Sequence, residues 1–208
     1  MRSDEIRQGE KIGIMGGTFD PVHYGHLFAA EFARVGAGLN RVIFVPSGNP
    51  PHKSYDGMAP AEDRFEMTRL AIEDNKDFEI SRVEIDREGP SYTADTLELI
   101  SAINPEAELF LITGLDAALD MPNWHEPKKI ISLCKILIIA RPGYICDKIS
   151  ALNEIIRDSL LVLDTDMVDI SATDIREKAR SGGCIRYMTP DAVCDYITSK
   201  SLYSGAEA

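Results

Sequence analysis

The sequence predicts a single α/β domain with a doubly wound, mostly parallel sheet. Short apolar segments of about five residues alternate with helical patterns of about ten or more, which is the order of strand–helix–strand units. The apolar segments are also nearly continuous, as in KILIIA at residues 135–140, and strands that are covered on both faces have this composition. Ligands of such a sheet bind beyond the carboxyl ends of its strands, so functional residues are expected directly after strands.

Each expected element has its own signal. The run KIGIM at residues 11–15 is apolar and ends at a Gly-Gly pair, which predicts a strand followed by a turn. Residues 25–35 carry apolar side chains at helical spacing, which predicts a helix. The further expected strands are 41–45, 78–85, 109–113, 135–140 and 160–163. The further expected helices are 61–73, 92–103, 147–157, 171–180 and 191–199.

Length and composition bound the domain organisation. The chain has 208 residues, and its hydrophobic and charged fractions of 44% and 27% are those of a soluble globular protein. We expect a flexible tail at residues 1–10 and one domain at residues 11–203, with C-terminal helices at 171–200 included. The apolar runs are far shorter than the roughly 20 residues of a membrane span, and residues 1–10 lack the apolar segment of a secretory signal. A cytoplasmic protein with no membrane partner is therefore expected.

Charge and cysteine content disfavour further classes. The net charge of -12 argues against a protein that coats nucleic acid, although a few local donors can still hold the phosphates of a mononucleotide. The four cysteines have no CxxC spacing, which disfavours both a zinc site and a disulfide framework. We therefore expect reduced cysteines and no nucleic-acid partner.

The first motif, GGTFDPVHYGHL at residues 16–27, joins the first expected strand to the first expected helix. Its two glycines allow the backbone to approach a ligand closely. If the helix begins near Tyr24, His23 and His26 lie together at its start and can point the same way. A helix N-terminus offers free N–H groups and the positive end of a dipole to an anion. Two imidazole donors at this position predict a phosphate site.

A second motif, ISATDIR at residues 170–176, has the signals of a helix start. Ser171 and, three residues later, Asp174 resemble a capping box with Asp in place of Glu. The helix then places Arg176 near its beginning, where the planar guanidinium can bind a phosphate through two hydrogen bonds. Taken alone, this pattern predicts only a helix N-terminus.

Together the two strings resemble signatures of the nucleotidyltransferase superfamily. GGTFDPVHYGHL is similar to the T/HxGH signature in the longer form found in bacterial nicotinate-nucleotide adenylyltransferases, and ISATDIR is similar to the IS-S/T-x-x-I-R segment of that family. The resemblance covers nearly the whole chain, about residues 11–199, with Ala172 where Ser is common. It implies a Rossmann-like fold and adenylyl transfer from ATP to nicotinate mononucleotide, a step of NAD biosynthesis.

The resemblance also implies roles for single residues. His23, His26 and Arg176 are the implied catalytic residues, which contact the ATP phosphates and stabilise the transition state. The implied ATP-binding residues are Gly16, Gly17, Thr18, Phe19, His23, His26, Asp116, Arg141, Ser171, Thr173 and Arg176.

Three further segments match the family, mostly on the side of the second substrate, and one of them is SYTADTL at residues 91–97, which contains Thr93. PSGNPPHK at residues 46–53 matches a segment that lies over the active site, and GLDAALDMPNW at residues 114–124 matches a GxD that precedes a Trp. In the family that aromatic ring packs on the nicotinate ring, and backbone N–H groups at the positions of Thr93 and His125 receive its carboxylate. The implied substrate-binding residues are Asp20, His52, Lys53, Thr93, Trp124 and His125.

The implied reaction needs no side-chain nucleophile. The 5′-phosphate of nicotinate mononucleotide is already an anionic nucleophile, so catalysis consists of positioning and charge stabilisation. ATP is a substrate, and Mg²⁺ is expected to bind mainly through the ATP phosphates, which leaves no residue assigned as a metal ligand. A monomer and a homo-oligomer are both compatible with the sequence.

Two alternative functions stay open at this point. One is another HxGH nucleotidyltransferase, acting on nicotinamide mononucleotide or phosphopantetheine, or a cytidylyltransferase; GGTFDP, PPHK and the single Trp disfavour the last two. The other is a nucleotide-binding module without turnover, which the absence of GxGxxG after the first strand disfavours.

Overall fold

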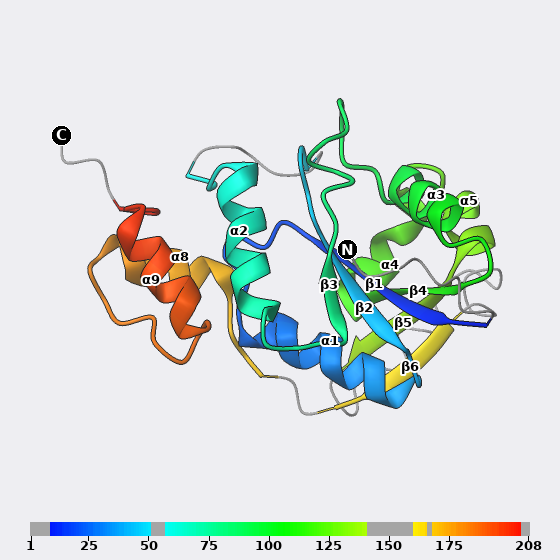
Figure 1. Ribbon diagram of the computed structural model, residues 1–208, viewed down its shortest axis with the longest axis horizontal. Coiled ribbons are helices and arrows are strands. Elements are labelled where there is room, and N and C mark those ends of the chain that lie inside the picture. The colour runs from blue at the N-terminus through cyan, green and yellow to red at the C-terminus, as the bar shows by residue number, and fades with distance from the viewer. Residues whose placement is uncertain (1–8, 51–56, 141–159, 166–167, 205–208) are drawn as a thin grey trace. The chain divides into compact units, whose positions relative to one another are not determined.

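A computed structural model describes residues 9–50, 57–140, 160–165 and 168–204 (Figure 1). Six strands form one sheet in the order β3-β2-β1-β4-β5-β6. The strands are β1 (Lys11–Gly17), β2 (Arg41–Pro46), β3 (Phe78–Ile80), β4 (Glu108–Gly114), β5 (Lys135–Ala140) and β6 (Leu160–Asp164). The helices are α1 (Tyr24–Gly36), α2 (Ala61–Ile72), α3 (Thr93–Ile103), α4 (Leu115–Asp120), η1 (Met121–Asn123), α5 (Pro127–Leu133), α8 (Ala172–Arg180) and α9 (Asp191–Ser199).

The backbone contacts divide the chain into two compact units, each assembled from separate segments. Unit 1 contains the described residues of Met1–Gly16, Ala30–Ile43 and Tyr92–Asp166. Unit 2 contains the described residues of Gly17–Ala29, Phe44–Ser91 and Met167–Ala208. The two signature motifs, apart from Gly16, therefore fall in unit 2, and the segments of Thr93, Asp116 and Trp124 fall in unit 1.

Unit 1 is built on parallel strands with apolar side chains. β4 pairs with β1 and with β5, and β5 pairs with β6, all in parallel register. The central residues of β4 and β5 are buried, as the continuous apolar composition predicts. Gly13 allows close packing in β1, because a Cβ atom there would lie 2.8 Å from the terminal carbons of Leu39 and Ile112, which would have to shift. Helices α3 and α5 pack side by side in this unit (Figure 1).

Unit 2 is held together by a helix pair and an aromatic cluster. Helix α2 packs against α9, and Tyr196 on α9 donates a hydrogen bond to Asp63 Oδ1 on α2 at 2.8 Å. The rings of Phe19, Phe44 and Phe78 form a chain with centroid separations of 5.7 and 5.1 Å. The loop of the first motif therefore enters the core of this unit through Phe19.

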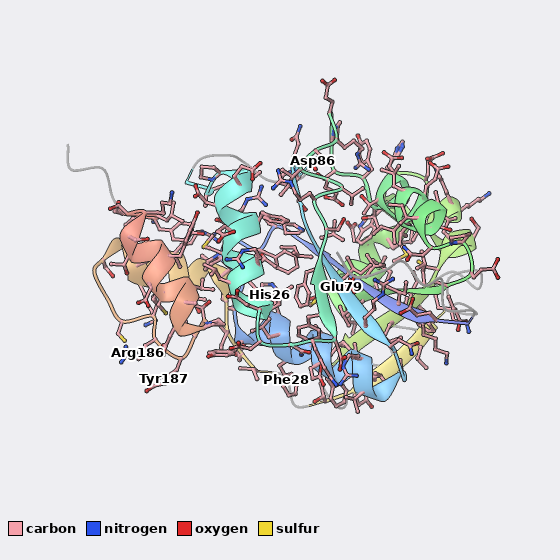
Figure 2. All side chains as sticks on the ribbon, in the orientation of Figure 1. His26, Phe28, Glu79, Asp86, Arg186 and Tyr187 are labelled. Atoms are coloured by element: carbon pink, nitrogen blue, oxygen red, sulfur yellow. The ribbon has the colours of Figure 1, made fainter. Side chains whose placement is uncertain are left out.

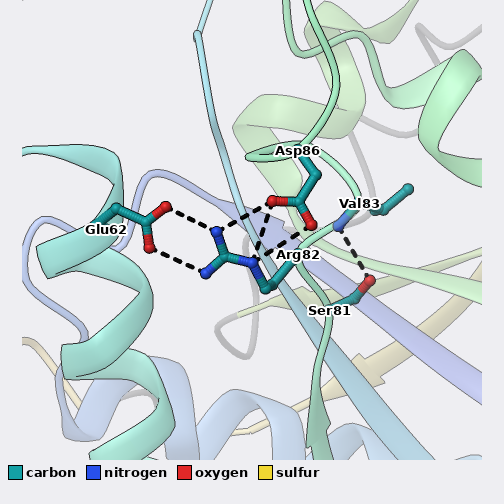
Figure 3. A network of polar contacts seen from close by, with 5 residues as sticks. All are labelled: Glu62, Ser81, Arg82, Val83 and Asp86. Carbon is teal, nitrogen blue, oxygen red and sulfur yellow. Dashed lines mark hydrogen bonds and ion pairs between the residues drawn. The ribbon is translucent and has the colours of Figure 1, made fainter.

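One expected strand is shorter than the sequence indicated. The expectation for residues 78–85 is correct only for Phe78–Ile80. Ser81 N–H still donates to Phe44 O, but the N–H groups of Ile85 and Asp86 both donate to Arg82 O, which closes a turn. Arg82 stabilises this turn through hydrogen bonds to Asp86 and to Glu62 of α2 (Figure 3). Apolar residues continue in the sequence as far as Ile85, which is beyond the point at which the chain turns.

The remaining elements agree largely with the sequence. The other five expected strands are present, and so are the expected helices that begin near 25, 61, 92, 171 and 191. The expected helix at 147–157 lies outside the described residues. Helices α4, η1 and α5 were not expected. Within the described residues, none of the helices is long and apolar enough to cross a membrane.

Candidate active site

The first motif forms a turn between β1 and α1, as its glycines and its helix-start signal predict. Gly16, the first residue of the motif, is exposed, and Gly17 ends β1 and is half-buried. Thr18 and Phe19 are buried, and Phe19 has a positive φ of 49°, which is uncommon outside glycine. Gly17 O accepts hydrogen bonds from the backbone N–H and the hydroxyl of Ser47, which hold the end of β1 in place.

The two histidines of this motif lie face to face. α1 begins at Tyr24, so His23 is the residue before the helix and His26 is in its first turn. Their rings stack with centroids 3.7 Å apart and planes at 28°. His23 N–H donates to His26 Nδ1 at 3.3 Å. An Nδ1 that accepts a hydrogen bond leaves the proton of the neutral imidazole on Nε2, so His26 presents Nε2–H as a donor.

His23 is held in its neutral form by burial. Its side chain is 7% exposed, and in the described structure its Nδ1 has no hydrogen-bond partner. Burial lowers the pKa of His23 to about 4, because the charged form would lose its hydration. At neutral pH this residue therefore contributes a neutral imidazole.

Gly25 is the residue that permits this stacking. A Cβ atom at Gly25 would lie 3.0 Å from Cε1 and Nδ1 of His23 and 3.4 Å from Val168 O. Contacts of 3.0 Å are closer than nine in ten contacts of real Cβ atoms, so the His23 ring would have to move. The glycine of HxGH thus has a packing role in this chain.

The second motif forms the N-terminus of α8, as predicted. Ser171 caps the helix and accepts a hydrogen bond from Thr173 N–H at 3.2 Å. Arg176 is in the second turn and is half-buried. Its Nη1 donates to Asp20 O at 2.7 Å, and its Nη2 donates to Thr173 Oγ1 at 3.1 Å. The structure therefore brings Arg176 to the loop that precedes His23, across 156 residues of sequence.

Asp20 links several parts of unit 2. It is 6% exposed, and its Oδ1 accepts hydrogen bonds from Ala59 N–H at 3.1 Å and from the Tyr203 hydroxyl at 2.7 Å. Its Oδ2 lies 3.7 Å from Arg176 Nη1. The resemblance implied that Asp20 binds the substrate, and in this structure its Oδ1 accepts both of these hydrogen bonds from the protein.

Sequence reasoning missed several residues that hold the motif loop. Arg64 of α2 is 1% exposed and donates to Thr18 O at 2.7 Å and to Ala59 O at 3.0 Å. Thr189 donates its hydroxyl hydrogen to Val22 O at 2.7 Å. A buried Arg in a helix that also carries exposed charges gives no pattern that separates it from a surface cation. Only the fold shows that its hydrogen bonds go to backbone carbonyls.

The loop between α8 and α9 divides into an exposed part and a part bound to α1. Arg186 and Tyr187 are exposed, Tyr187 by 79% (Figure 2). The next residue, Met188, accepts a hydrogen bond from Tyr24 N–H at 3.0 Å. This contact and that of Thr189 with Val22 O fix the start of α1, which carries His26 (labelled in Figure 2).

A second cluster of expected residues lies in unit 1. Thr93 is the first residue of α3, and the first N–H groups of a helix have no acceptor within it. The ring of Tyr92 stacks on that of His125 with centroids 4.2 Å apart and planes at 25°. Thr93 directly follows Tyr92, so it lies near His125. The resemblance implied that the backbone of these two residues receives one carboxylate. Tyr92 is a further residue that the sequence did not single out.

The single Trp belongs to the same segment. Trp124 follows η1, is half-buried, and donates from Nε1 to Asp120 Oδ2 at 3.3 Å. Asp116 lies in the first turn of α4 and is exposed. His52, Lys53 and Arg141 lie outside the described residues.

One group of side chains in the described structure has the donors for a metal ion. Asp95, His125 and Glu126 each offer an atom within 4.8 Å of the others. Glu126 Oε2, however, lies 3.4 Å from the ammonium of Lys129, which also binds Glu98 at 2.9 Å. Lys129 therefore already supplies a positive charge at this cluster.

The comparison with protein families identifies the superfamily. The model of the cytidylyltransferase-like family matches residues 14–178, which include both signature motifs. Among solved structures, the chain is similar to the Plasmodium falciparum nicotinic acid mononucleotide adenylyltransferase complexed with NaAD. The TM-score is 0.75 at 19% identity, with 93% of this chain and 97% of that one covered. This likeness shows that the Rossmann-like α/β fold predicted from the sequence is correct.

Curated relatives are similar along nearly their whole length. A probable nicotinate-nucleotide adenylyltransferase from Roseiflexus sp. (strain RS-1) is 47% identical, with 92% of this chain and 97% of the relative covered. One from Desulfitobacterium hafniense (strain Y51) is 44% identical, with 93% and 96% covered. The chain therefore belongs to the cytidylyltransferase-like family and, within it, to the nicotinate-nucleotide adenylyltransferases.

Proposed function

We propose that this protein transfers the adenylyl group of ATP to nicotinate mononucleotide and releases pyrophosphate. The observation that supports this most strongly is the arrangement in unit 2. His23 and His26 stack at the start of α1, and Arg176 is hydrogen-bonded to the loop that leads into it. Imidazole donors at a helix N-terminus, together with a guanidinium bound to the adjacent loop, have the chemistry of a polyphosphate site.

The reaction is an in-line substitution at the α-phosphorus of ATP. A 5′-phosphate oxygen of nicotinate mononucleotide forms the new P–O bond, and the bond between the α-phosphorus and the bridging oxygen to the β-phosphorus breaks. The bonding electrons leave with pyrophosphate, and the product is nicotinate adenine dinucleotide. Both reactants are anions, so the protein's task is to bring them together and to stabilise the charge of the transition state.

The two histidines act in this proposal as neutral hydrogen-bond donors. His26 offers Nε2–H because its Nδ1 accepts a hydrogen bond from the backbone N–H of His23. The low pKa of His23 keeps that ring neutral at physiological pH. Donors that are fixed before the substrate binds stabilise developing charge without reorganisation, which is the source of their catalytic effect.

Arg176 supplies the positive charge. A guanidinium has five N–H donors in a fixed plane, and the two hydrogen bonds to Asp20 O and Thr173 Oγ1 orient this plane. The remaining N–H groups are those that we assign to the triphosphate. We also assign the exposed Ser171 and Thr173, at the start of the same helix, to contacts with the triphosphate.

The pyridine end is assigned to unit 1. The N–H groups at the start of α3 suit the carboxylate of nicotinate, because the first N–H groups of a helix have no acceptor within that helix. We assign the backbone N–H of His125 to the same carboxylate on the family resemblance. The indole of Trp124 suits the flat pyridine ring. A neutral amide would present its own N–H₂ donor to these donors, so the proposal includes a preference for nicotinate over nicotinamide.

Mg²⁺ would be held by the phosphates of ATP rather than by this chain's carboxylates. Asp20, the acidic residue of the first motif, has Oδ1 occupied by two donors and Oδ2 near Arg176. Its geometry suits a structural carboxylate more than a metal ligand. When bound, the ion neutralises part of the phosphate charge and keeps most of its own water ligands.

The test is the release of pyrophosphate with matched nucleotides. ATP and nicotinate mononucleotide together should give equimolar pyrophosphate and nicotinate adenine dinucleotide, and ATP alone should give neither. CTP is the control for the nucleotide, because the family model is cytidylyltransferase-like. Turnover with CTP in place of ATP, turnover only with phosphopantetheine, or binding of ATP without any turnover would each overturn the proposal.

A further inference from the structure

The C-terminal segment reaches back to the first motif through one hydrogen bond. The hydroxyl of Tyr203 donates to Asp20 Oδ1 at 2.7 Å, and the two residues are 183 positions apart. Burial and the nearby charge of Asp20 raise the pKa of Tyr203, so its hydroxyl stays protonated and acts as the donor. Sequence reasoning placed residue 203 at the end of the domain and gave it no role.

The backbone after α9 is shaped to return Tyr203 to this position. Leu202 N–H donates to Ile197 O, and Ser201 N–H donates to Thr198 O. These two bonds form a Schellman motif, in which the residue after the helix cap adopts the left-handed conformation. That residue is Ser201, with φ of 52°, and Tyr203 itself has φ of 64°. Residues other than glycine adopt this conformation only when surrounding contacts hold them.

The hydrogen bond from Tyr203 weakens the attraction between the Asp20 carboxylate and the Arg176 guanidinium. The Asp20 carboxylate is buried, and the positive Arg176 Nη1 lies 3.7 Å from its Oδ2, beyond hydrogen-bond distance. Tyr203 and Ala59 N–H stabilise the negative charge on Oδ1. Without the hydroxyl, a buried carboxylate with one donor fewer would attract the guanidinium more strongly.

We propose that Tyr203 is a positioning residue that keeps Arg176 available to the triphosphate of ATP. Its hydroxyl stabilises the negative charge on Asp20 Oδ1 through a hydrogen bond. Arg176 therefore stays on the backbone carbonyl of Asp20 and on Thr173 Oγ1, with its remaining N–H groups free to meet phosphate. The inference rests on the proposed function, because it takes the ATP phosphates as the partner of Arg176.

The experiment compares two Tyr→Phe variants that each remove one hydrogen bond to an aspartate. Tyr203→Phe removes the bond to Asp20, and Tyr196→Phe removes the 2.8 Å bond to Asp63 in the same unit. Binding of ATP is measured by calorimetry without the second substrate, and KM is measured for each substrate separately. A hydrogen bond to a charged group corresponds to roughly a tenfold change or more in an equilibrium constant.

Tyr203→Phe should weaken ATP binding about tenfold and raise the KM for ATP, with less than about a twofold change in the KM for nicotinate mononucleotide. Tyr196→Phe should leave both values within about twofold. In an Arg176→Lys background, which lacks the planar fork, Tyr203→Phe should have little further effect on ATP binding. A purely structural role would instead weaken both substrates, or act equally with Arg and with Lys at position 176.

The outcomes separate this inference from the proposed function. A wild-type protein that binds ATP, together with a Tyr203→Phe variant that binds it equally well, would overturn the inference alone. A wild-type protein that binds no ATP would overturn the proposed function and the inference together. The melting temperatures of the two variants show whether either has lost its fold.

Discussion

The imidazole rings of His23 and His26 stack with centroids 3.7 Å apart because α1 begins between them, at Tyr24. A spacing of three residues across a helix start puts both rings on one side of the chain. The backbone N–H of His23 then orients the His26 ring through its Nδ1. The string HxGH therefore encodes a pair of fixed donors.

Replacing His26 by Ala should remove most of the activity and leave the fold intact. Loss of one fixed donor to a charged transition state typically lowers the rate by ~10²–10³. Besides its stack on His23, His26 has an edge contact with Phe19 at 5.0 Å, so a small loss of stability is expected as well. The measurement is kcat for pyrophosphate release, with the melting temperature as a control. Near-normal turnover would show that HxGH is not the phosphate site.

Gly25→Ala should lower activity although alanine is the better helix former. In a helix interior, alanine is favoured over glycine by roughly 1 kcal/mol. At this position the added Cβ would lie 3.0 Å from the His23 ring, which must then shift by a few tenths of an ångström and disturb its stack on His26. We expect a reduced kcat and no gain in the free energy of unfolding. A variant that is both more stable and fully active would contradict the packing role of Gly25.

The buried His23 should make stability depend on pH. Its pKa is about 4 in the folded protein against 6.5 as the ordinary value, so the unfolded chain binds a proton first as the pH falls. The contribution of His23 to stability is complete above pH 6.5 and is lost between 6.5 and 4. Between pH 7 and pH 5 the free energy of unfolding should fall by about 2 kcal/mol from this residue.

Urea unfolding at the two pH values checks this prediction. His23→Asn, which cannot titrate in this range, is the matched control. Its free energy of unfolding should fall by about 2 kcal/mol less than that of the wild type between pH 7 and pH 5. If the free energy of unfolding falls equally with pH in the wild type and the variant, His23 is not the neutral, buried group described above.

How far the sequence predicted this structure depended on the length and regularity of each element. The apolar runs 109–113 and 135–140 match the bounds of β4 and β5 to within about a residue. A short, continuous apolar run is typical of a strand that is buried on both faces. Residues 115–133 form three helical pieces of three to seven residues, which are too short for a periodic pattern. Two of the three pieces have a proline in their first turn, Pro122 in η1 and Pro127 in α5.

The motif residues of the proposed site could be recognised in the sequence, but the residues that hold the motif loop in place could not. His23, His26 and Arg176 carry recognisable strings, whereas Arg64, Thr189 and Tyr203 act through backbone carbonyls or one buried carboxylate. Those partners are far away in the sequence, so no local pattern connects them. The motif also gave no sign that Asp20 Oδ1 accepts hydrogen bonds from Ala59 N–H and from the Tyr203 hydroxyl.

Trp124→Ala should weaken the use of both mononucleotides by similar factors. The indole would stack on the pyridine ring but cannot distinguish the substituent, because the two rings are alike. Loss of an aromatic contact corresponds to about a three- to tenfold rise in KM. Trp124→Phe, which keeps a ring, is the control and should have a smaller effect. A preference for nicotinate that disappears in Trp124→Ala would refute the separate roles of ring and backbone.

The most direct test of the whole account is kcat/KM of the wild-type protein for nicotinate and nicotinamide mononucleotide with ATP. Backbone N–H groups near Thr93 and His125 should donate hydrogen bonds to the carboxylate of nicotinate. The N–H₂ group of nicotinamide would face these donors without an acceptor. One such mismatch typically costs ~1–3 kcal/mol, or about tenfold to over a hundredfold in selectivity. The account predicts that pyrophosphate release favours nicotinate mononucleotide by at least about tenfold. Equal use of the two mononucleotides, or a preference for nicotinamide, would contradict it.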